Sequence, residues 1–209
     1  MRLRDLLDAM PVAAILRGIA PGEAVAVARV LVDAGIRIVE VPLNSPDPFD
    51  SIARIAAAFR GICLVGAGTV LRAADVDRVA GAGGRLVVAP NFNPAVVARA
   101  CELGLVAVPG VQTPTEAFAA LAAGADALKF FPCEVIPPQA IRAMRAVLPR
   151  DTIVLAVGGI GAENMPAYRE AGVDGFGIGS SLYKPGMAVG EVAERAGSLA
   201  AAAKALAAK

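Results

Sequence analysis

The chain has 209 residues, a length that can bury a substantial core, and we expect one domain spanning residues 1–209. Lys and Arg total 20 and Asp and Glu total 19, so the net charge of +1 gives no reason to expect a nucleic acid or an anionic membrane as a partner. Hydrophobic residues make up 56% of the chain, but its apolar stretches stay well below the ~18 residues that a membrane-spanning helix needs. These properties predict a soluble protein.

The amino-terminal segment and the rare residue types indicate a cytoplasmic protein. Asp5 and Asp8 interrupt the apolar residues of the first segment, which predicts a short amphipathic helix and no signal peptide. The 3 cysteines lack the spacing of a metal site or a redox motif, which favours reduced thiols.

Histidine is absent, which removes the commonest general base and the commonest transition-metal ligand. We therefore expect no metal or other cofactor, and proton transfer by Glu, Asp, Lys, Tyr or water.

Short apolar runs rich in β-branched residues recur about every 20 to 27 residues and alternate with alanine-rich segments of helical period. This alternation is typical of repeated βα units around a parallel sheet. The predicted strands cover residues 12–17, 38–43, 63–68, 85–90, 106–109, 127–131, 152–157 and 175–179. Eight strands predict an α/β fold, a (β/α)8 TIM barrel, preceded by the short amino-terminal helix.

Capping residues predict where several helices begin and end. Ser45-Pro46, Asn93-Pro94 and Thr113-Pro114 each place a side-chain acceptor at the N-cap and proline at the first helical position. The expected left-handed glycines at the other helix ends are Gly35, Gly104, Gly124 and Gly172. The alanine-rich end, 198–209, predicts a last helix.

An open, doubly wound sheet that binds a dinucleotide is the alternative architecture. It should show GxGxxG after an early strand, with an acidic residue about 20 positions further on. Gly66-Ala67-Gly68-Thr69 lacks the third glycine, and Gly158-Gly159-Ile160-Gly161 comes too late for the first βα turn. The barrel therefore remains the prediction.

Three charged residues, Arg17, Glu40 and Lys129, lie toward the carboxyl ends of predicted strands, where barrel active sites are built. Glu40 is on the second strand and Lys129 on the sixth, and these strands face each other across an eight-stranded barrel. Both side chains can therefore meet in the lumen. Burying both as a merely structural pair would cost several kcal/mol each, so we favour a functional role.

The environment of Lys129 predicts a nucleophile. A free lysine has a pKa near ~10.4, so little of the reactive amine exists at neutral pH. Apolar neighbours such as Leu128 and Phe130, with the cationic Arg17 nearby, would lower that pKa. Lys129 is therefore interpreted as a residue that forms a Schiff base with a carbonyl substrate.

Two glycine-containing loops complete the predicted site. Gly158-Gly159 follows the seventh strand and Gly179-Ser180 follows the eighth. The corresponding loops of TIM barrels bind phosphate through backbone N–H groups, and glycine permits the close approach. We therefore predict a phosphate-binding site formed by these two loops.

With these residues identified, the chain resembles the pyruvate-forming sugar-acid phosphate aldolases, the family of 2-keto-3-deoxy-6-phosphogluconate and 2-keto-3-deoxy-6-phosphogalactonate aldolases. The resemblance covers nearly the whole length. Its markers are AILRGI (14–19), VEVPLNSP (39–46), GAGTVL (66–71), PNFN (90–93), PG (109–110), ALKFFP (127–132), AVGGI (156–160) and GIGSSLY (177–183).

The resemblance implies roles for particular residues. The Schiff-base lysine falls on Lys129 and the acid/base glutamate on Glu40. Arg17, Thr69 and Pro90 are implied around the pyruvate moiety. The remaining implied residues are Phe131 as a wall beside it, and Gly158, Gly159, Gly179 and Ser180 at the phosphate. Family members commonly form trimers, so a homotrimer is expected.

Two positions resemble the galactonate branch of the family more than the gluconate branch. They are Val157, where the gluconate branch is expected to have threonine, and the PLNS segment that contains Asn44. The two substrates differ at carbon 4, and valine cannot form a hydrogen bond to a hydroxyl there. Val157 and Asn44 are therefore the candidates for epimer selection, with a preference for the galactonate epimer.

The predicted reaction is retro-aldol cleavage of a phosphorylated keto sugar acid to pyruvate and glyceraldehyde 3-phosphate. Alternative substrates are the phosphogluconate epimer and 4-hydroxy-2-oxoglutarate. A rival enzyme is a phosphosugar isomerase or decarboxylase that uses Lys129 only as a charge. A rival of another class is a non-catalytic barrel that binds sugar phosphates.

Overall fold

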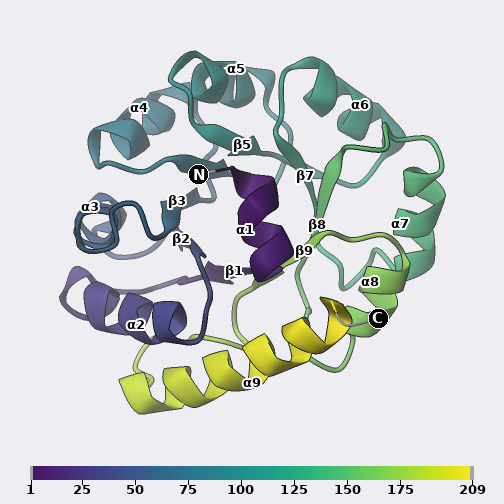
Figure 1. Cartoon of the computed structure of the whole chain (residues 1–209). Helices are drawn as coiled ribbons and strands as arrows, with labels where there is room; N and C mark the ends of the chain where they lie inside the picture. The colour runs from purple at the N-terminus through teal and green to yellow at the C-terminus, as the bar shows by residue number, and fades with distance from the viewer. Residues whose placement is uncertain (1, 208–209) are drawn as a thin grey trace.

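The computed structural model describes residues 2–207, which contain nine strands and nine helices (Figure 1). The strands are β1 (Val12–Ile15), β2 (Ile38–Pro42), β3 (Leu64–Gly68), β4 (Leu86–Val88), β5 (Val106–Val108), β6 (Gly110–Val111), β7 (Ala127–Phe130), β8 (Ile153–Val157) and β9 (Gly175–Ile178). The helices are α1 (Leu3–Ala9), α2 (Pro21–Asp33), α3 (Pro48–Ala58), α4 (Ala73–Gly81), α5 (Pro94–Glu102), α6 (Pro114–Ala122), α7 (Pro138–Arg145), α8 (Met165–Glu170) and α9 (Val189–Ala207).

The parallel sheet closes through a strand that is interrupted by proline. Its order is β5-β4-β3-β2-β1-β9-β8-β7-β6, so the two end strands are consecutive in the chain. β5 pairs with β4 and β6 pairs with β7, and only Pro109 separates the two halves. Proline has no N–H to donate, which interrupts the ladder at this point. The expected (β/α)8 barrel is confirmed, with a fifth strand that extends beyond its predicted end to Val111.

Helix α1 closes the amino-terminal end of the barrel. Figure 1 looks along the barrel, with the later helices as an outer ring and α1 across the opening. Leu3 and Leu7 of α1 are buried in the same cluster as inward-facing strand residues. Arg4 also donates a hydrogen bond to Asp174 at 2.7 Å. The helix therefore blocks this end, and the functional groups gather at the other.

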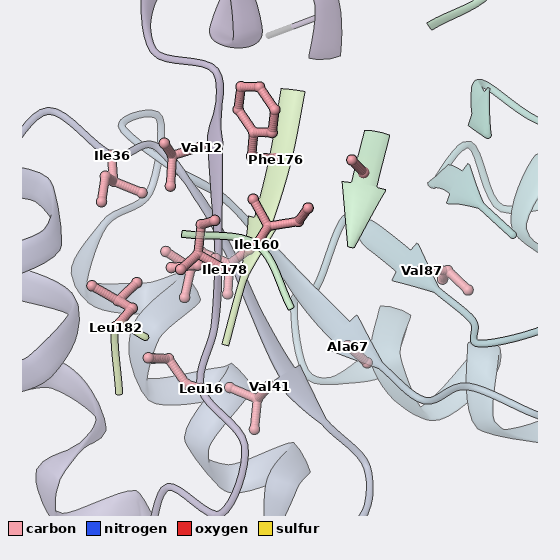
Figure 2. Packing of buried hydrophobic residues seen from close by; sticks show 14 of the residues in the cluster. Val12, Leu16, Ile36, Val41, Ala67, Val87, Ile160, Phe176, Ile178 and Leu182 are labelled. Atoms are coloured by element: carbon pink, nitrogen blue, oxygen red, sulfur yellow. The ribbon is translucent and has the colours of Figure 1, made fainter. Parts of the chain in front are cut away.

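Strand side chains alternate between the barrel interior and the layer under the helices. Figure 2 shows part of the outer layer, where Val12, Val41 and Phe176 are buried. The inner cluster includes Ile38 of β2 and Ala127 of β7. Glu40 and Lys129 come two residues further along the same strands, so they also point into the lumen.

The capping predictions were confirmed except at one helix. Asn93 accepts a hydrogen bond from Ala95 N–H, Thr113 forms a capping box with Glu116, and the four predicted terminal glycines all have positive φ. The prediction for Ser45 was wrong, because α3 begins at Pro48 with Asp47 as its N-cap. The Ser45 hydroxyl instead accepts a hydrogen bond from Gly18 N–H at 2.9 Å.

Two segment boundaries differ from the prediction. β1 ends at Ile15, so Arg17 lies in the loop after the strand. α9 begins at Val189, earlier than residue 198, and the final predicted helical positions 208 and 209 lie outside the described residues. Within residues 2–207, no helix is both long enough and apolar enough to cross a membrane.

Candidate active site

A cavity of about 140 Å³ at the carboxyl end of the strands contains most of the predicted site residues. Its walls come from the ends of the first three strands and of β7, β8 and β9, with the loops that follow them. The predicted residues that line it are Lys129, Glu40, Arg17, Thr69, Phe131, Val157, Gly158, Gly159, Gly179 and Ser180.

Pro90 and Asn44 are the predicted residues that do not line this cavity. Pro90 is half-buried after β4, and its carbonyl group lies against Gly110 of β6. Asn44 is exposed in the loop after β2 and accepts a hydrogen bond of 2.7 Å from the Arg17 guanidinium. Asn44 therefore contacts a residue of the cavity wall, Arg17, without lining the cavity itself.

Glu40 is buried on β2, with only 4% of its surface exposed. Its Oε2 atom is buried without a hydrogen-bond partner. Burial raises the pKa of this carboxyl, and the positive charges of Lys129 and Arg17 partly oppose the rise. A carboxyl whose pKa is raised holds its proton more readily, which suits a group that must donate as well as accept a proton.

Gly68 at the end of β3 makes room for the Glu40 carboxylate. The two strands are neighbours in the sheet, and a Cβ atom at residue 68 would collide with Oε2 of Glu40. The backbone of Gly68 does not have positive φ, so this glycine is required by the close approach and not by its dihedral angles. The position of the acid therefore depends on the neighbouring strand.

Lys129 is 5% exposed on β7, opposite Glu40 in the cavity wall. Its Nζ lies 4.6 Å from the centroid of the Phe131 ring. The pKa of Lys129 is lowered chiefly because burial disfavours the ammonium ion; Glu40 opposes this shift and Arg17 adds to it. The shifts at Lys129 and Glu40 both favour neutral forms, an amine facing a carboxylic acid.

Thr69 follows Gly68 and has a left-handed backbone with φ of 56°. This conformation is rare for a β-branched residue and usually needs support from surrounding structure. The residue is half-buried and lines the cavity. Its strained backbone therefore orients a hydroxyl-bearing side chain beside the reactive pair.

The glycine loops present unpaired backbone donors to the cavity. Gly158 and Gly159 have φ values of 98° and 64°. Among the hydrogen bonds of the described residues, none is donated by the N–H groups of Gly158, Gly159, Gly179 or Ser180. Backbone N–H groups without partners in glycine-containing loops are suited to bind an anion.

Sequence reasoning missed Glu134, which also lines the cavity. It lies in the loop between β7 and α7, and its carboxylate is next to Gly158 and Gly159. An exposed glutamate in a loop gives no signal in the sequence, because its direction depends on the path of the backbone. Among residues 2–207, no group of His, Cys, Asp and Glu could hold a metal ion.

Comparison with known proteins shows the family to which the chain is related. Residues 3–198 match the family model "KDPG and KHG aldolase". The chain is 53% identical over 186 residues to a probable 2-dehydro-3-deoxy-6-phosphogalactonate aldolase of Rhizobium meliloti (strain 1021), covering 89% of this chain and 88% of the relative. It is 48% identical over 187 residues to the 2-dehydro-3-deoxy-6-phosphogalactonate aldolase of Escherichia coli (strain K12), covering 90% and 91% of the two chains.

Two further matches carry names from the same family. A 2-dehydro-3-deoxy-phosphogluconate aldolase of Treponema pallidum (strain Nichols) is 35% identical over 146 residues, which cover 70% of this chain and 69% of the relative. The solved structure named "Native KDPGal structure" has a TM-score of 0.94 and 45% identity, covering 96% of this chain and 97% of that one. The family predicted from the sequence motifs is confirmed, and the chain belongs to the KDPG and KHG aldolase family.

Proposed function

We propose that this protein is a Schiff-base aldolase that cleaves 2-dehydro-3-deoxy-6-phosphogalactonate into pyruvate and D-glyceraldehyde 3-phosphate in sugar-acid catabolism. The observation that carries the proposal is the buried amine of Lys129 facing the buried carboxyl of Glu40. The same cavity presents unpaired N–H groups that suit a phosphate. Two relatives named for this activity, at 53% and 48% identity, support the choice of substrate.

The reaction begins when the neutral Nζ of Lys129 attacks the keto carbon of the substrate. Glu40 donates a proton to the departing hydroxyl of the carbinolamine, and loss of water leaves an iminium ion. The carbon-4 hydroxyl then gives its proton to Glu40, directly or through water. The bond between carbons 3 and 4 breaks, its electron pair enters the iminium to form an enamine, and the carbon-4 fragment leaves as D-glyceraldehyde 3-phosphate. Protonation of carbon 3 and hydrolysis release pyruvate and restore the amine.

The two ends of the cavity suit the two ends of this substrate. Arg17, Thr69 and Phe131 line the region around Lys129, and we assign them to the pyruvate moiety. Pro90 is assigned to the same region by resemblance, as a support for the loop after β4. The phosphate is assigned to the N–H groups of Gly158, Gly159, Gly179 and Ser180.

Val157 is proposed to select the carbon-4 epimer. It is buried at the end of β8 and lines the cavity between Lys129 and the glycine loop. Its side chain offers no hydrogen bond, so a hydroxyl directed toward it would lose a partner on binding. Asn44 is proposed to contribute to epimer selection by fixing the position of Arg17, which donates a hydrogen bond to it.

We further propose that the protein is a cytoplasmic homotrimer. Exposed large apolar side chains such as Val135, Val147 and Leu71 support an oligomer, since association would remove them from water. Light scattering at micromolar concentration is expected to give three times the monomer mass. A stable monomer would contradict the proposal.

Reduction with borohydride in the presence of pyruvate tests the Schiff base. We expect one reduced pyruvate adduct per chain on Lys129, because only an imine is fixed by this treatment. Intact mass and peptide mapping measure it. Lys129→Met should abolish the adduct and turnover, whereas Lys184→Met, at an exposed lysine outside the cavity, should retain both. An unchanged mass in the unaltered protein would favour an isomerase, a decarboxylase or a non-catalytic barrel.

Gly68→Ala tests whether the position of Glu40 limits proton transfer. The added methyl group takes the space of the carboxylate, so kcat should fall by about 10²-fold or more, as expected for loss of a general acid/base. Steady-state kinetics measure the effect, and circular dichroism checks the fold. Gly81→Ala is the control, since nothing lies within 4 Å of its added Cβ. Full activity in Gly68→Ala would refute the role of the Gly68 space.

Val157→Thr tests epimer selection. We expect kcat/KM for the gluconate epimer to rise relative to the galactonate epimer by about 10- to 100-fold, because threonine supplies a hydrogen-bonding hydroxyl. Coupled pyruvate detection with each epimer measures the ratio, and Val157→Ala controls for the change in shape. If the unaltered protein prefers the gluconate epimer, the substrate assignment is wrong while the lysine mechanism stands.

A further inference from the structure

Glu134 places a carboxylate within the group of backbone donors that we assign to phosphate. A Cβ atom added to Gly158 would overlap its Oε2, and one added to Gly159 would lie 2.9 Å from its Cγ and 3.2 Å from its Cδ. Both glycines line the same cavity as Glu134. The carboxylate therefore lies against the concave face of this loop.

Within residues 2–207, no positively charged group pairs with the Glu134 carboxylate. Among the ion pairs and side-chain hydrogen bonds of the described residues, none involves it. The cations that line the cavity are Arg17 and Lys129, which belong with Glu40 at the pyruvate end. At the glycine loops the cavity thus has neutral N–H donors and one unpaired negative charge.

We infer, on the basis of the proposed phosphate site, that Glu134 is a specificity-determining residue whose charge weakens the binding of phosphate. A phosphate group and a carboxylate compete for the same N–H donors and repel each other across the short distance that the loop allows. Binding of a phosphate ester requires the Glu134 side chain to leave Gly158. The exposed position of the residue gives it room to do so.

The expected effect is on affinity and not on the chemical step. Lys129 and Glu40 carry out bond cleavage, and Glu134 contacts neither in the hydrogen-bond and ion-pair network of the described residues. Its charge acts on the phosphate of the substrate and on the phosphate of the aldehyde product alike. Keeping this end of the cavity weakly binding favours departure of the phosphorylated product.

Glu134→Gln removes the charge and keeps the shape. We expect the inhibition constant of inorganic phosphate and the KM of the phosphorylated substrate to fall by about 3- to 30-fold, as for loss of one nearby like charge. The KM of pyruvate in the aldol direction should stay within about twofold, because pyruvate carries no phosphate. Glu163→Gln is the matched control, because Glu163 lies beside Gly161 in the loop that also contains Gly158 and Gly159 but does not line the cavity.

Salt dependence separates repulsion from a change of shape. The difference between Glu134→Gln and the unaltered enzyme should shrink as salt rises from about 0.01 M to about 1 M, where the screening length drops from ~30 Å to ~3 Å. Equal phosphate inhibition of both proteins at low salt would overturn the inference and leave the phosphate site intact. Weaker inhibition of the variant would overturn it too, by making Glu134 an attractive contact. Absence of competition by phosphate in both proteins would overturn the phosphate site as well, while the pyruvate adduct would still test the lysine.

Discussion

The burial of one lysine and one glutamate in the same barrel lumen is the constraint on which the site depends. Taking both groups from water disfavours their charged forms, so the lysine is pushed toward amine and the glutamate toward acid. These are the protonation states that attack on a carbonyl and loss of water require. Burial of these two groups, which would destabilise a barrel without this function, therefore sets the protonation states that the reaction needs.

The rest of the barrel supports this pair. The alternation of side chains along β2 and β7 directs both groups inward, and α1 fills the opposite end with leucine. Within residues 2–207 the cavity therefore opens at the carboxyl ends of the strands, where the glycine loops line it.

The catalytic pair could be predicted from the sequence because a charged residue is unusual in an apolar strand. Lys129 and Glu40 interrupt buried runs, and the symmetry of an eight-stranded barrel then places them face to face. Ser45 was misassigned because Asp47-Pro48 repeats the same capping pattern two residues later, and local chemistry does not choose between them. Glu134 was missed for a different reason, since its position in the cavity depends on a tertiary contact with Gly158 that no sequence periodicity predicts.

The contact between Gly68 and Glu40 links two positions that lie on different strands. A larger residue at 68 is sterically compatible only with a shorter acid at 40, and a shorter acid would in turn withdraw from the lysine across the lumen. A substitution at residue 68 or at residue 40 therefore requires a matching substitution at the other position. The family motifs GAGT and VEVP thus constrain each other's evolution as one unit, although 23 residues, 43–65, separate them in the sequence.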